Sequence, residues 1–595
     1  MGEVRQGTLR QRIKVEWKRN GFYGIARKIL RRLKGEPPEP PIPEWNVLTY
    51  KEKKEQRQTE FPQRYLFSIL VPLYNTPIHF LEEMVASVAD QTYGGWELCL
   101  ADGSDEAHRE VGNWCRNYAA QDSRVKYCKL EENKGISENT NACIQMASGE
   151  FIALFDHDDL LTPDALFEAM RVLNHNLKVD VIYTDEDKIN ADSTEYSEPH
   201  FKSDFNLDLL RSNNYICHFL IVRKALADKV GGLRTEYNGS QDYDFIFRCI
   251  EQARVVYHIP KVLYHWRMHA ASTAANPESK MYCYDAGKRA IEAHLKRMRV
   301  EGEVLMTEHL GFYRVKYPVK GEPLISIIIP NKDEASTLDV CLRSIQERST
   351  YKNYEIIVVE NNSINPDTFA YYATLEKYHN LQVVEWLDAF HYPKINNFGI
   401  SFAKGEYLIL LNNDTEILTP NWMEELLSHC QRPEVGITGT KLYYPDDKIQ
   451  HAGVIIGLGG IAGHAFSCQS REDPGYFARA IVQQDLSAVT AACFMVSRKI
   501  YDEVGGMEEQ LQVAFNDVDF CLKVRDKGYL VVYNPNVELY HYESKSRGLE
   551  DTPRKHARFE REVNFMKARW EKVLEKGDPY YNPNLTLVRG DFSPK

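Results

Sequence analysis

The chain lacks clustered cysteines and long apolar runs. Its 12 cysteines are scattered singly along 595 residues without any Cys-x-x-Cys pair, a pattern that favours reduced cytosolic thiols over a disulfide framework or a zinc site. The longest strongly apolar stretches, Ser487–Val496 and His451–Phe466, fall short of the roughly 18 to 20 residues that a membrane-spanning helix needs. The basic N-terminus has no apolar core of a secretory signal. We therefore expect a protein that neither spans a membrane nor leaves the cytoplasm.

Motifs that mark several common enzyme classes are also missing. The sequence has no Gly-x-x-x-x-Gly-Lys-Ser/Thr phosphate loop and no Gly-x-Ser-x-Gly nucleophile turn. The stretch Gly457–Ala462 matches the letters of a dinucleotide fingerprint, but no helical pattern follows it. These absences argue against P-loop nucleotide hydrolysis, dinucleotide-dependent redox chemistry and serine hydrolysis.

Outside the first 34 residues, acidic side chains outnumber basic ones. The net charge is −12, yet residues 1–34 hold eleven Lys or Arg against two Glu, a local charge of +9, so the remainder carries −21. This acidic body argues against nucleic acid as a partner, because phosphate contacts need broad positive surface. The basic arm also places Phe22, Ile25 and Ile29 at helical spacing, which suits a helix lying on an anionic membrane surface. A helix packed on the acidic body and a disordered tail are the alternatives.

What the sequence does contain is an internal repeat. A chain of this length exceeds one hydrophobic core, and two domains of about 250 residues are the natural division. Each half opens with a β-branched run that ends in proline, Ser68–Pro72 and Ser326–Pro330, followed by an amphipathic helical stretch, Leu81–Ala89 and Leu338–Ile345. Strands that alternate with crossover helices predict parallel βαβ units, and therefore an α/β fold with an open, doubly wound sheet in each half.

Later features of the repeat recur in the same order. Asn141 and Asn397 each stand eight residues before a glycine, and an apolar strand follows, Phe151–Phe155 and Tyr407–Leu411. Each half then shows a polar cluster, Val-Gly-Gly, an Asp-x-Asp at the start of a helical pattern, and Leu-Tyr-His. A period this long indicates duplicated domains rather than a solenoid. Ligands of such sheets bind at the carboxyl ends of the strands, where the polar clusters stand.

The repeat sets the expected domain boundaries. Residues 1–60 form the basic amphipathic arm and a hinge that contains the proline-rich stretch Glu36–Pro41. We expect the first domain at residues 61–310, the second at residues 321–575, and a C-terminal tail at residues 576–595.

The acidic turn after an apolar strand is the strongest chemical signal. Asp156 and Asp158 alternate along the chain, so both can face a pocket rim, whereas the second half has Asn412 and Asp414 at these places. A nucleoside diphosphate is bridged by a divalent cation, and Mn²⁺ or Mg²⁺ prefers carboxylate oxygens. A single Asp-x-Asp is usually a solvated turn, but its recurrence behind matched strands predicts a cation site.

A second carboxylate follows Val-Gly-Gly in both halves. Asp242 and Asp517 are candidates for a general base, since sugar transfer to an alcohol requires removal of the hydroxyl proton. The alternative is a helix N-cap, which also favours Asp. For Asp244 and Asp519, two residues further on, we prefer the capping role or an orienting one.

Histidines close each repeat. His265 and His541 end the two Leu-Tyr-His triplets and could complete a metal shell or touch the diphosphate. His269 competes with His265 for this role, and sequence spacing does not separate the two. A purely structural histidine is the alternative at each position.

Taken together, these ordered motifs resemble the family 2 inverting glycosyltransferases of the GT-A fold. The resemblance covers Ser68–Ser272 and Ser326–Gly548. It implies two tandem GT-A domains. In the first half, the segments Tyr183–Lys188 and His200–Lys202 resemble those of bacterial O-antigen and capsule transferases. In the second half, three segments resemble the rhamnosyltransferase-like branch of the family: Lys394–Asn397, Ile449–Gly453 and Asn516–Asp519.

Site residues follow from the resemblance by position. Catalytic roles are implied for Asp242 and Asp517 as bases. The second half departs from the pattern at Glu360-Asn361 and at Asn412–Asp414. Donor-binding roles are implied for Pro72, Tyr74, Asp102, Lys134, Asn141, Asp156, Pro330, Asn361, Lys394 and Asn397. Metal-binding roles are assigned to Asp156, Asp158, His265, His269, Asp414 and His541.

The resemblance also implies a reaction and its partners. The acceptor oxygen attacks the anomeric carbon in line, a metal steadies the departing nucleoside diphosphate, and the configuration inverts. The expected donors are UDP-hexoses for either domain, or dTDP-rhamnose for the second. The expected acceptor is a growing, polyprenyl-linked glycan at the inner face of the cell membrane, contacted through residues 1–34. The leading hypothesis is a bifunctional enzyme.

Three other readings are open. One domain could be catalytic and the other an acceptor-holding pseudo-domain, or the chain could be a non-catalytic scaffold or glycan-binding module. A nucleotidyltransferase is the third. Such an enzyme normally has a basic, Gly-rich loop near the first strand, and the segment Pro72–Asn75 at this place is neither basic nor Gly-rich. Retention of an Asp at both base positions favours chemistry.

Overall fold

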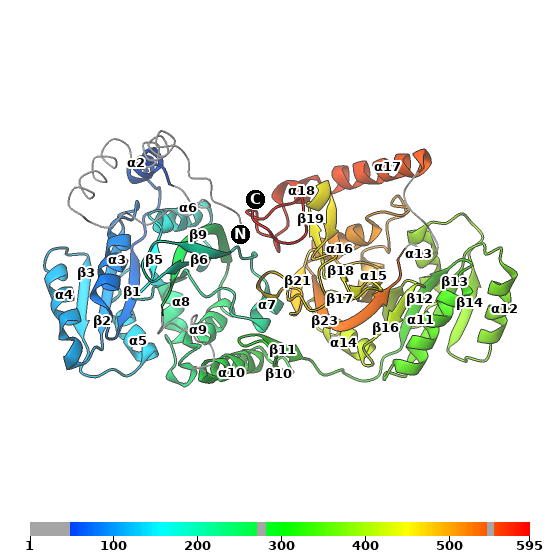
Figure 1. Cartoon of the computed structure of the whole chain (residues 1–595), viewed down its shortest axis with the longest axis horizontal. Coiled ribbons are helices and arrows are strands. Elements are labelled where there is room, and N and C mark those ends of the chain that lie inside the picture. Colours follow the sequence, from blue (N-terminus) through cyan, green and yellow to red (C-terminus); the bar gives the residue numbers. More distant parts are fainter. Residues whose placement is uncertain (1–47, 270–280, 544–551) are drawn as a thin grey trace. The chain divides into compact units, whose positions relative to one another are not determined.

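The computed structural model describes residues 48–269, 281–543 and 552–595 (Figure 1). The predicted basic arm at residues 1–34 and the proline-rich stretch lie outside the described residues. Contacts divide the chain into two compact units, the first formed by residues 48–205 and 214–300 and the second by residues 206–213 and 301–595. Within the described part of the chain, no helix is both long and apolar enough to cross a bilayer.

The first unit is built on a mixed sheet with a parallel core. Its strand order is β3-β2-β1-β4-β8-β6-β9-β5, with β7 paired to β6. Strands β1 to β4 run parallel, whereas β8 is antiparallel to β4 and β6. The strands are β1 (Phe67–Leu73), β2 (Trp96–Asp102), β3 (Val125–Lys129), β4 (Phe151–Leu154), β5 (Leu160–Leu161), β6 (Val181–Asn190), β7 (Tyr196–His200), β8 (Leu220–Arg223) and β9 (Val256–Met268).

Helices cover the parallel core on both faces, which explains why every residue of β1 and β2 is buried. The chain steps from β1 to β2 to β3 in one direction and then returns to β4 beside β1. Because crossovers are right-handed, the return helix lies on the face opposite the first two helices. The helices of this unit are α2 (Tyr50–Gln58), α3 (Ile78–Ala89), α4 (Arg109–Ala119), α5 (Ile136–Met146), α6 (Ala165–His175), α8 (Lys224–Val230), α9 (Gln241–Ile250) and α10 (Met281–Met298).

The second unit repeats this plan, and its sheet order β14-β13-β12-β15-β22-β17-β23-β16 matches that of the first in all eight strands. β18 pairs with β17 and β21 with β23. The two sheets confirm the predicted α/β fold with a doubly wound, mostly parallel sheet in each half, and each sheet also contains antiparallel strands. The strands of this sheet are β12 (Ile325–Asn331), β13 (Tyr354–Glu360), β14 (Leu381–Glu385), β15 (Tyr407–Leu411), β16 (Thr415–Ile417), β17 (Val435–Tyr443), β18 (Ile449–His451), β21 (Gln484–Leu486), β22 (Cys493–Ser497) and β23 (Leu530–His541).

Two small hairpins and a set of helices complete the second unit. The apolar, Gly-rich stretch of the sequence becomes the hairpin β19 (Val454–Ile456) and β20 (Ala462–His464), and the other hairpin is β10 (Glu303–Met306) and β11 (Tyr313–Lys316). The predicted C-terminal tail is part of this unit, because Leu585 and Phe592 are buried. The helices are α7 (Leu207–Ser212), α11 (Ala335–Arg348), α12 (Pro366–Leu375), α13 (Tyr392–Phe402), α14 (Trp422–Cys430), α15 (Arg498–Glu503), α16 (Asn516–Asp526), α17 (Pro553–Arg569) and α18 (Glu571–Lys576).

The ladder registers relate the two units residue by residue. Leu73 pairs with Asp102 in the first sheet, and Asn331 pairs with Glu360 in the second. Since Pro72 and Pro330 each stand one residue earlier in their strands, Asp102 corresponds to Glu360. The resemblance implies the donor-binding role of Asp102 for Asn361 in the second half, one residue after Glu360.

One segment of the second unit comes from between β7 and β8. α7 packs against β11 and β21. Its Asp208 is buried and forms a bidentate ion pair with Arg432, with nitrogen–oxygen distances of 2.7 and 3.0 Å. Asn206 and Asp485 exchange two hydrogen bonds of 2.8 and 2.9 Å. The second unit is therefore assembled from two separate stretches of chain. The predicted domains, residues 61–310 and 321–575, are each continuous and do not include this arrangement.

Substitution of Asp208 tests this assembly. In the Asp208→Ala variant, Arg432 keeps only the partly exposed Glu434 as an ionic partner among the described residues, and leaving a buried charge uncompensated costs about 3–5 kcal/mol. We expect calorimetry to show the second unit unfolding at a lower temperature. Asp446→Ala, which removes an exposed pair with Lys448, is the control and should change stability by less than about 1 kcal/mol. Equal unfolding temperatures for the two variants would contradict the role of the buried pair.

Candidate active sites

Both sheets reverse their strand order at the same place. β4 lies beside β1, and β15 lies beside β12, so the carboxyl ends of these strands border a crevice that no connection crosses. The predicted acidic turns follow β4 and β15 directly. The structure therefore brings Asp156, Asp158 and Asp414 to the edge where ligands of such sheets bind.

In the first unit, Asp158 is paired with a histidine. His269 Nε2 lies 2.7 Å from Asp158 Oδ2. Burial would raise the pKa of Asp158, but the hydrogen bond from His269 and the nearby charge of His157 hold it below its usual range. A carboxylate and an imidazole on the rim of the crevice are donors that suit Mn²⁺, so these residues fit a divalent cation.

The structure separates the two histidines that sequence spacing could not. His265 is buried, and its Nδ1 lies 2.5 Å from Asp187 Oδ1 on β6. Of these two histidines, His269 contacts the acidic turn, whereas His265 contacts Asp187 on β6. The metal role predicted for His265 stays a prediction, and the contact with Asp187 favours a structural one.

Asp159, which follows the acidic pair, is part of the framework. Its carboxylate accepts hydrogen bonds from the Tyr264 hydroxyl and from the Arg267 backbone N–H. Burial, together with the charges of Asp158 and Asp156, raises its pKa well above the usual range. The side chain of Asp156, in contrast, is 48% exposed.

Asp242 stands in the first turn of α9. Asn214 Nδ2 donates to Asp242 Oδ2 at 2.7 Å. Burial raises the pKa of Asp242, while the charge of His218 and the Asn214 hydrogen bond act in the opposite direction. A carboxylate with a raised pKa is a better proton acceptor near neutral pH, as a general base requires. Asp244, which is fully buried and 2.8 Å from Arg248, is structural.

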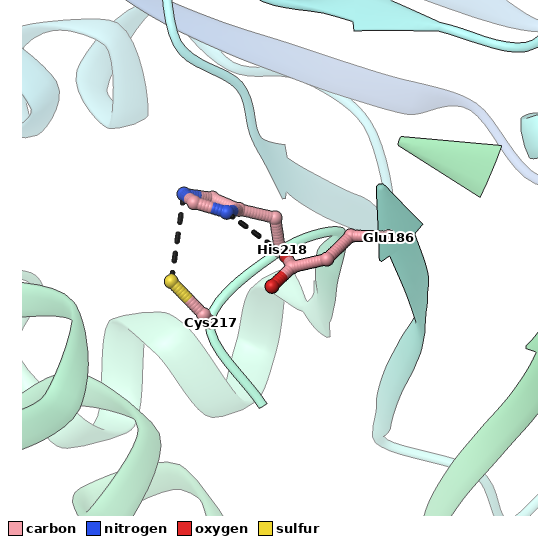
Figure 2. Close-up of side chains that lie close together, drawn as sticks. All are labelled: Glu186, Cys217 and His218. Atoms are coloured by element: carbon pink, nitrogen blue, oxygen red, sulfur yellow. Dashed lines mark hydrogen bonds and ion pairs between the residues drawn. The ribbon is translucent and has the colours of Figure 1, made fainter. Parts of the chain in front are cut away.

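Sequence reasoning missed three neighbours of the acidic turn (Figure 2). His218 Nδ1 lies 3.0 Å from Glu186 Oε2, and its Nε2 lies 3.5 Å from Cys217 Sγ and 3.7 Å from Asp156 Oδ2. Burial would lower the pKa of His218, but Cys217, Asp156 and Glu186 raise it well above the usual range. The segment Tyr183–Lys188 resembles the family, but no sequence pattern links Glu186 to His218.

Asp102, the predicted base-binding residue, is buried at the end of β2 with its carboxylate already engaged. It accepts from Ser104 N–H and the Tyr127 hydroxyl, each at 2.8 Å, and Lys129 Nζ lies 3.5 Å away. Its counterpart Glu360 accepts from Ser363 and the Tyr372 hydroxyl in the same manner. Both carboxylates therefore order the loop after the second strand.

The remaining donor-binding candidates of the first unit differ in exposure. Pro72 is buried within β1, and Tyr74, just after the strand, is 47% exposed. Lys134 is exposed in the loop before α5, 3.4 Å from Glu132. Their donor roles stay predictions.

Asn141 and Asn397 make matched contacts that explain part of the repeat. The Asn141 amide donates to the Leu233 carbonyl and accepts from the Leu233 N–H, both at 2.9 Å, and Asn397 bonds Met507 in the same way at 3.1 and 3.0 Å. A Cβ on Gly232, whose φ is +67°, would lie 2.6 Å from Asn141 Oδ1. The Asn and the Val-Gly-Gly loop are thus one interlocked feature. These contacts do not test the donor-binding role predicted for Asn141 and Asn397.

The second unit has a cavity of about 450 Å³ at its strand ends. Five predicted site residues line this cavity: Pro330, Asn361, Asp414, Asp517 and His541. Other lining residues include Lys332, Phe390, Tyr392, Asn412, Ala491 and Ala492. Lys394, 4.0 Å from Glu509, is not among the lining residues.

Asp414 also contacts a histidine, His541, although the Leu-Tyr-His repeat places His541 at the position of His265 and not at that of His269. His541 Nε2 lies 3.1 Å from both Asp414 Oδ1 and Asn412 Nδ2, and its Nδ1 lies 2.6 Å from Gln450 Oε1. Since an amide oxygen only accepts, Nδ1 carries a proton, and in the neutral ring Nε2 presents a lone pair beside Asp414. This donor set also fits a divalent cation, with one carboxylate fewer than in the first unit.

Asp517 lies in the first turn of α16 at the cavity. Its Oδ2 accepts from the Ala491 backbone N–H at 3.2 Å. Asp519, bonded to Trp570 Nε1 at 2.8 Å, is structural, as Asp244 is. Asn361 donates from Nδ2 to the Asp388 carbonyl at 2.9 Å, and its buried Oδ1 has no hydrogen-bond partner within the described ranges.

The two units are α/β domains of the same plan, arranged in tandem along the sequence. The profile of glycosyl transferase family 2 matches residues 68–231 and 326–505, once in each unit. The chain belongs to glycosyl transferase family 2.

Several known proteins are similar over most of the chain. An uncharacterized protein of Sinorhizobium fredii, y4gI, is 47% identical over 89% of this chain and 58% of its own length. The O-antigen biosynthesis protein RfbC of Myxococcus xanthus is 35% identical over 93% of this chain and 44% of its own length. The chain thus spans about half the length of these relatives. A mannosyltransferase of Pyrobaculum calidifontis, solved with GDP-Man and Mn²⁺, overlaps with 51% of this chain and 79% of its own at 16% identity and a TM-score of 0.33.

Substitution of Asn141 separates a structural role from a donor-binding one. Asn141→Ala breaks two hydrogen bonds to the Leu233 backbone, so we expect the free energy of unfolding to fall by about 1–3 kcal/mol. Urea denaturation measures this change, and Asn117→Ala, at an exposed position of α4, should stay within about 0.5 kcal/mol of wild type. Unchanged stability together with a raised KM for the donor would instead support the role predicted from the resemblance.

Proposed function

We propose that the chain is a metal-dependent inverting glycosyltransferase that extends a cell-surface polysaccharide, with one active site in each unit. The observation that carries the proposal is a repeated geometry. Each unit places a carboxylate in the first turn of a corresponding helix, Asp242 or Asp517, at the edge that holds an Asp–His pair. The names of the O-antigen relative and of a hyaluronan synthase of Pasteurella multocida, 23% identical over 62% of this chain, support a polysaccharide product.

The proposed reaction is a single displacement. The acceptor hydroxyl oxygen forms a bond to the anomeric carbon as the bond from that carbon to the diphosphate oxygen breaks, which inverts the configuration. Asp242 or Asp517 takes the hydroxyl proton. A divalent cation held by Asp158 and His269, or by Asp414 and His541, would neutralise charge on the departing nucleoside diphosphate.

The two sites are not equal. Asn412 stands where the first unit has Asp156, so the second unit offers one carboxylate fewer for a cation. One catalytic unit with an acceptor-binding pseudo-domain is therefore the alternative. The retained Asp517, held by a backbone N–H in a cavity of about 450 Å³, favours two catalytic units.

Donor, acceptor and location complete the proposal. UDP-hexoses and dTDP-rhamnose are the proposed donors, and a polyprenyl-linked glycan is the proposed acceptor. The charge of +9 on residues 1–34 supports peripheral contact with the anionic cytoplasmic face of the membrane. These residues lie outside the described part of the chain.

Four substitutions test whether both units are catalytic. Donor turnover is measured with Mn²⁺ or Mg²⁺ across a panel of nucleotide sugars for Asp158→Ala, Asp414→Ala, Asp242→Asn and Asp517→Asn. Removal of a general base lowers turnover by about 10²–10⁴-fold. We expect Asp158→Ala and Asp242→Asn to abolish transfer from one donor, and Asp414→Ala and Asp517→Asn to abolish transfer from another.

Matched controls are Asp228→Asn on α8 and Asp526→Asn on α16, both exposed, which should retain wild-type turnover. If Asp414→Ala and Asp517→Asn change nothing while one donor accounts for all activity, the second unit is a helper and the bifunctional proposal fails.

The raised pKa of Asp242 predicts a pH dependence. The base works only when deprotonated, so turnover by the first unit should fall as the pH drops through this raised pKa, above the range of an exposed Asp. The Asn214 hydrogen bond lowers the pKa of Asp242, so Asn214→Ala should move the acidic limb of kcat/KM to higher pH. Turnover by the second unit is the internal control. An acidic limb that stays in place would exclude Asp242 as the group that titrates.

A further inference from the structure

A group of metal-ligating side chains lies beside the Asp-x-Asp turn of the first unit (Figure 2). The ligand atoms of Glu186, Cys217 and His218 lie within 4.8 Å of one another, and so do those of Asp156, Asp159 and His218. His218 is common to both groups. Glu186 comes from β6, while Cys217 and His218 precede β8.

The contacts of His218 give its two ring nitrogens different roles. Nδ1 is bonded to Glu186 Oε2 at 3.0 Å, which leaves Nε2 toward Cys217 Sγ at 3.5 Å and Asp156 Oδ2 at 3.7 Å. A carboxylate on the far nitrogen is the usual orienting partner of a metal-binding histidine. Sulfur and nitrogen ligands of one tetrahedral Zn²⁺ are about 3.6 Å apart, given bond lengths of about 2.3 and 2.0–2.1 Å.

Of the carboxylates of Glu186 and Asp156, the first is paired with a lysine in the part of the chain that the structure describes and the second is not. Lys202 Nζ lies 3.3 Å from Glu186 Oε2, so this orienting carboxylate is already neutralised. Lys202 itself is buried and donates to the Ile216 carbonyl at 2.7 Å. The carboxylate of Asp156, about half exposed, has no such lysine or arginine pair within the described residues, and its side chain can turn toward an ion.

We propose that Cys217 Sγ and His218 Nε2 bind a thiophilic divalent cation of the Zn²⁺ class, with Asp156 as the third ligand and Glu186 as the orienting group. This site is separate from the hard cation of the Asp158–His269 pair and does not depend on the proposed donor or reaction. Because Asp156 is also the first carboxylate of the Asp-x-Asp turn, occupancy of the site engages a residue of the donor edge. Thiolate and imidazole ligands select Zn²⁺ over Mg²⁺ and Mn²⁺.

The second unit lacks these ligands and provides a natural comparison. Leu154 pairs with Leu220 in the first sheet, and Leu410 pairs with Phe494 in the second. His218 stands two residues before Leu220 in the first unit, and Ala492 stands two residues before Phe494 in the second. The site therefore predicts one thiophilic ion per chain.

Cobalt binding to the full chain tests the proposal. The protein is freed of metal with a chelator and titrated with Co²⁺, which absorbs in the near ultraviolet when a thiolate coordinates it. We expect one such Co²⁺ per chain, displaced by Zn²⁺ but not by Mg²⁺. Cys217→Ser and His218→Gln should lose the thiolate band, and Glu186→Gln should weaken Co²⁺ affinity by about 10–100-fold.

Controls separate this site from other thiols and from the donor site. Cys128→Ser, a partly exposed cysteine of the first unit, and Cys468→Ser, an exposed one of the second, should keep the band, and so should Asp158→Ala. Circular dichroism checks that each variant is folded. No thiolate band in the wild type, a band that survives Cys217→Ser in folded protein, or a band lost in Cys128→Ser or Cys468→Ser would overturn the proposal.

Discussion

Both units depend on one constraint, the reversal of strand order between neighbouring parallel strands. β1 and β4 share a ladder while the connections on either side of them leave toward opposite faces, and β12 and β15 do the same. Backbone connections therefore cannot fill the crevice at the carboxyl ends of these strands. Side chains that follow the strands are held there by a buried sheet whose geometry does not depend on them. This separation lets the chain keep one framework and vary its chemistry.

The variation between the units is concentrated at that edge. Asp156 is replaced by Asn412, and His218 by Ala492, although the ladders that carry them keep the same register. Each unit nevertheless retains an aspartate that contacts a histidine. Each also retains a further aspartate in the first turn of a corresponding helix, α9 or α16. The second unit supports the ring of His541 through Gln450, and the first holds the ring of His218 through Glu186. The two units thus share the backbone framework and differ in the side chains at the strand ends.

Several features could be read from the sequence because they follow from local periodicity. Apolar strands ending in polar clusters placed Asp158 and Asp414 at the ligand edge, and the helical pattern after Asp242 and Asp517 put these residues in a first turn. The resemblance implies a donor-binding role for Asn141, and this role stays a prediction. Asn141 recurs as regularly as Asp158, yet its amide is bonded to the Leu233 backbone. Recurrence alone does not distinguish a residue that maintains a loop from one that meets a ligand, since both constraints preserve the residue.

By itself the sequence determined the fold class, the duplication, the family and the positions of the acidic turns, because strand and helix periods and strand-end polarity are local properties of the chain. Only the tertiary structure decided which side chains meet. It placed His269 rather than His265 on Asp158, shifted the counterpart of Asp102 from Asn361 to Glu360, and brought Glu186 to His218 across 32 residues. It also put Asn206–Asn213 into the second unit. These pairings depend on ladder registers and on packing between distant segments, which no local pattern encodes.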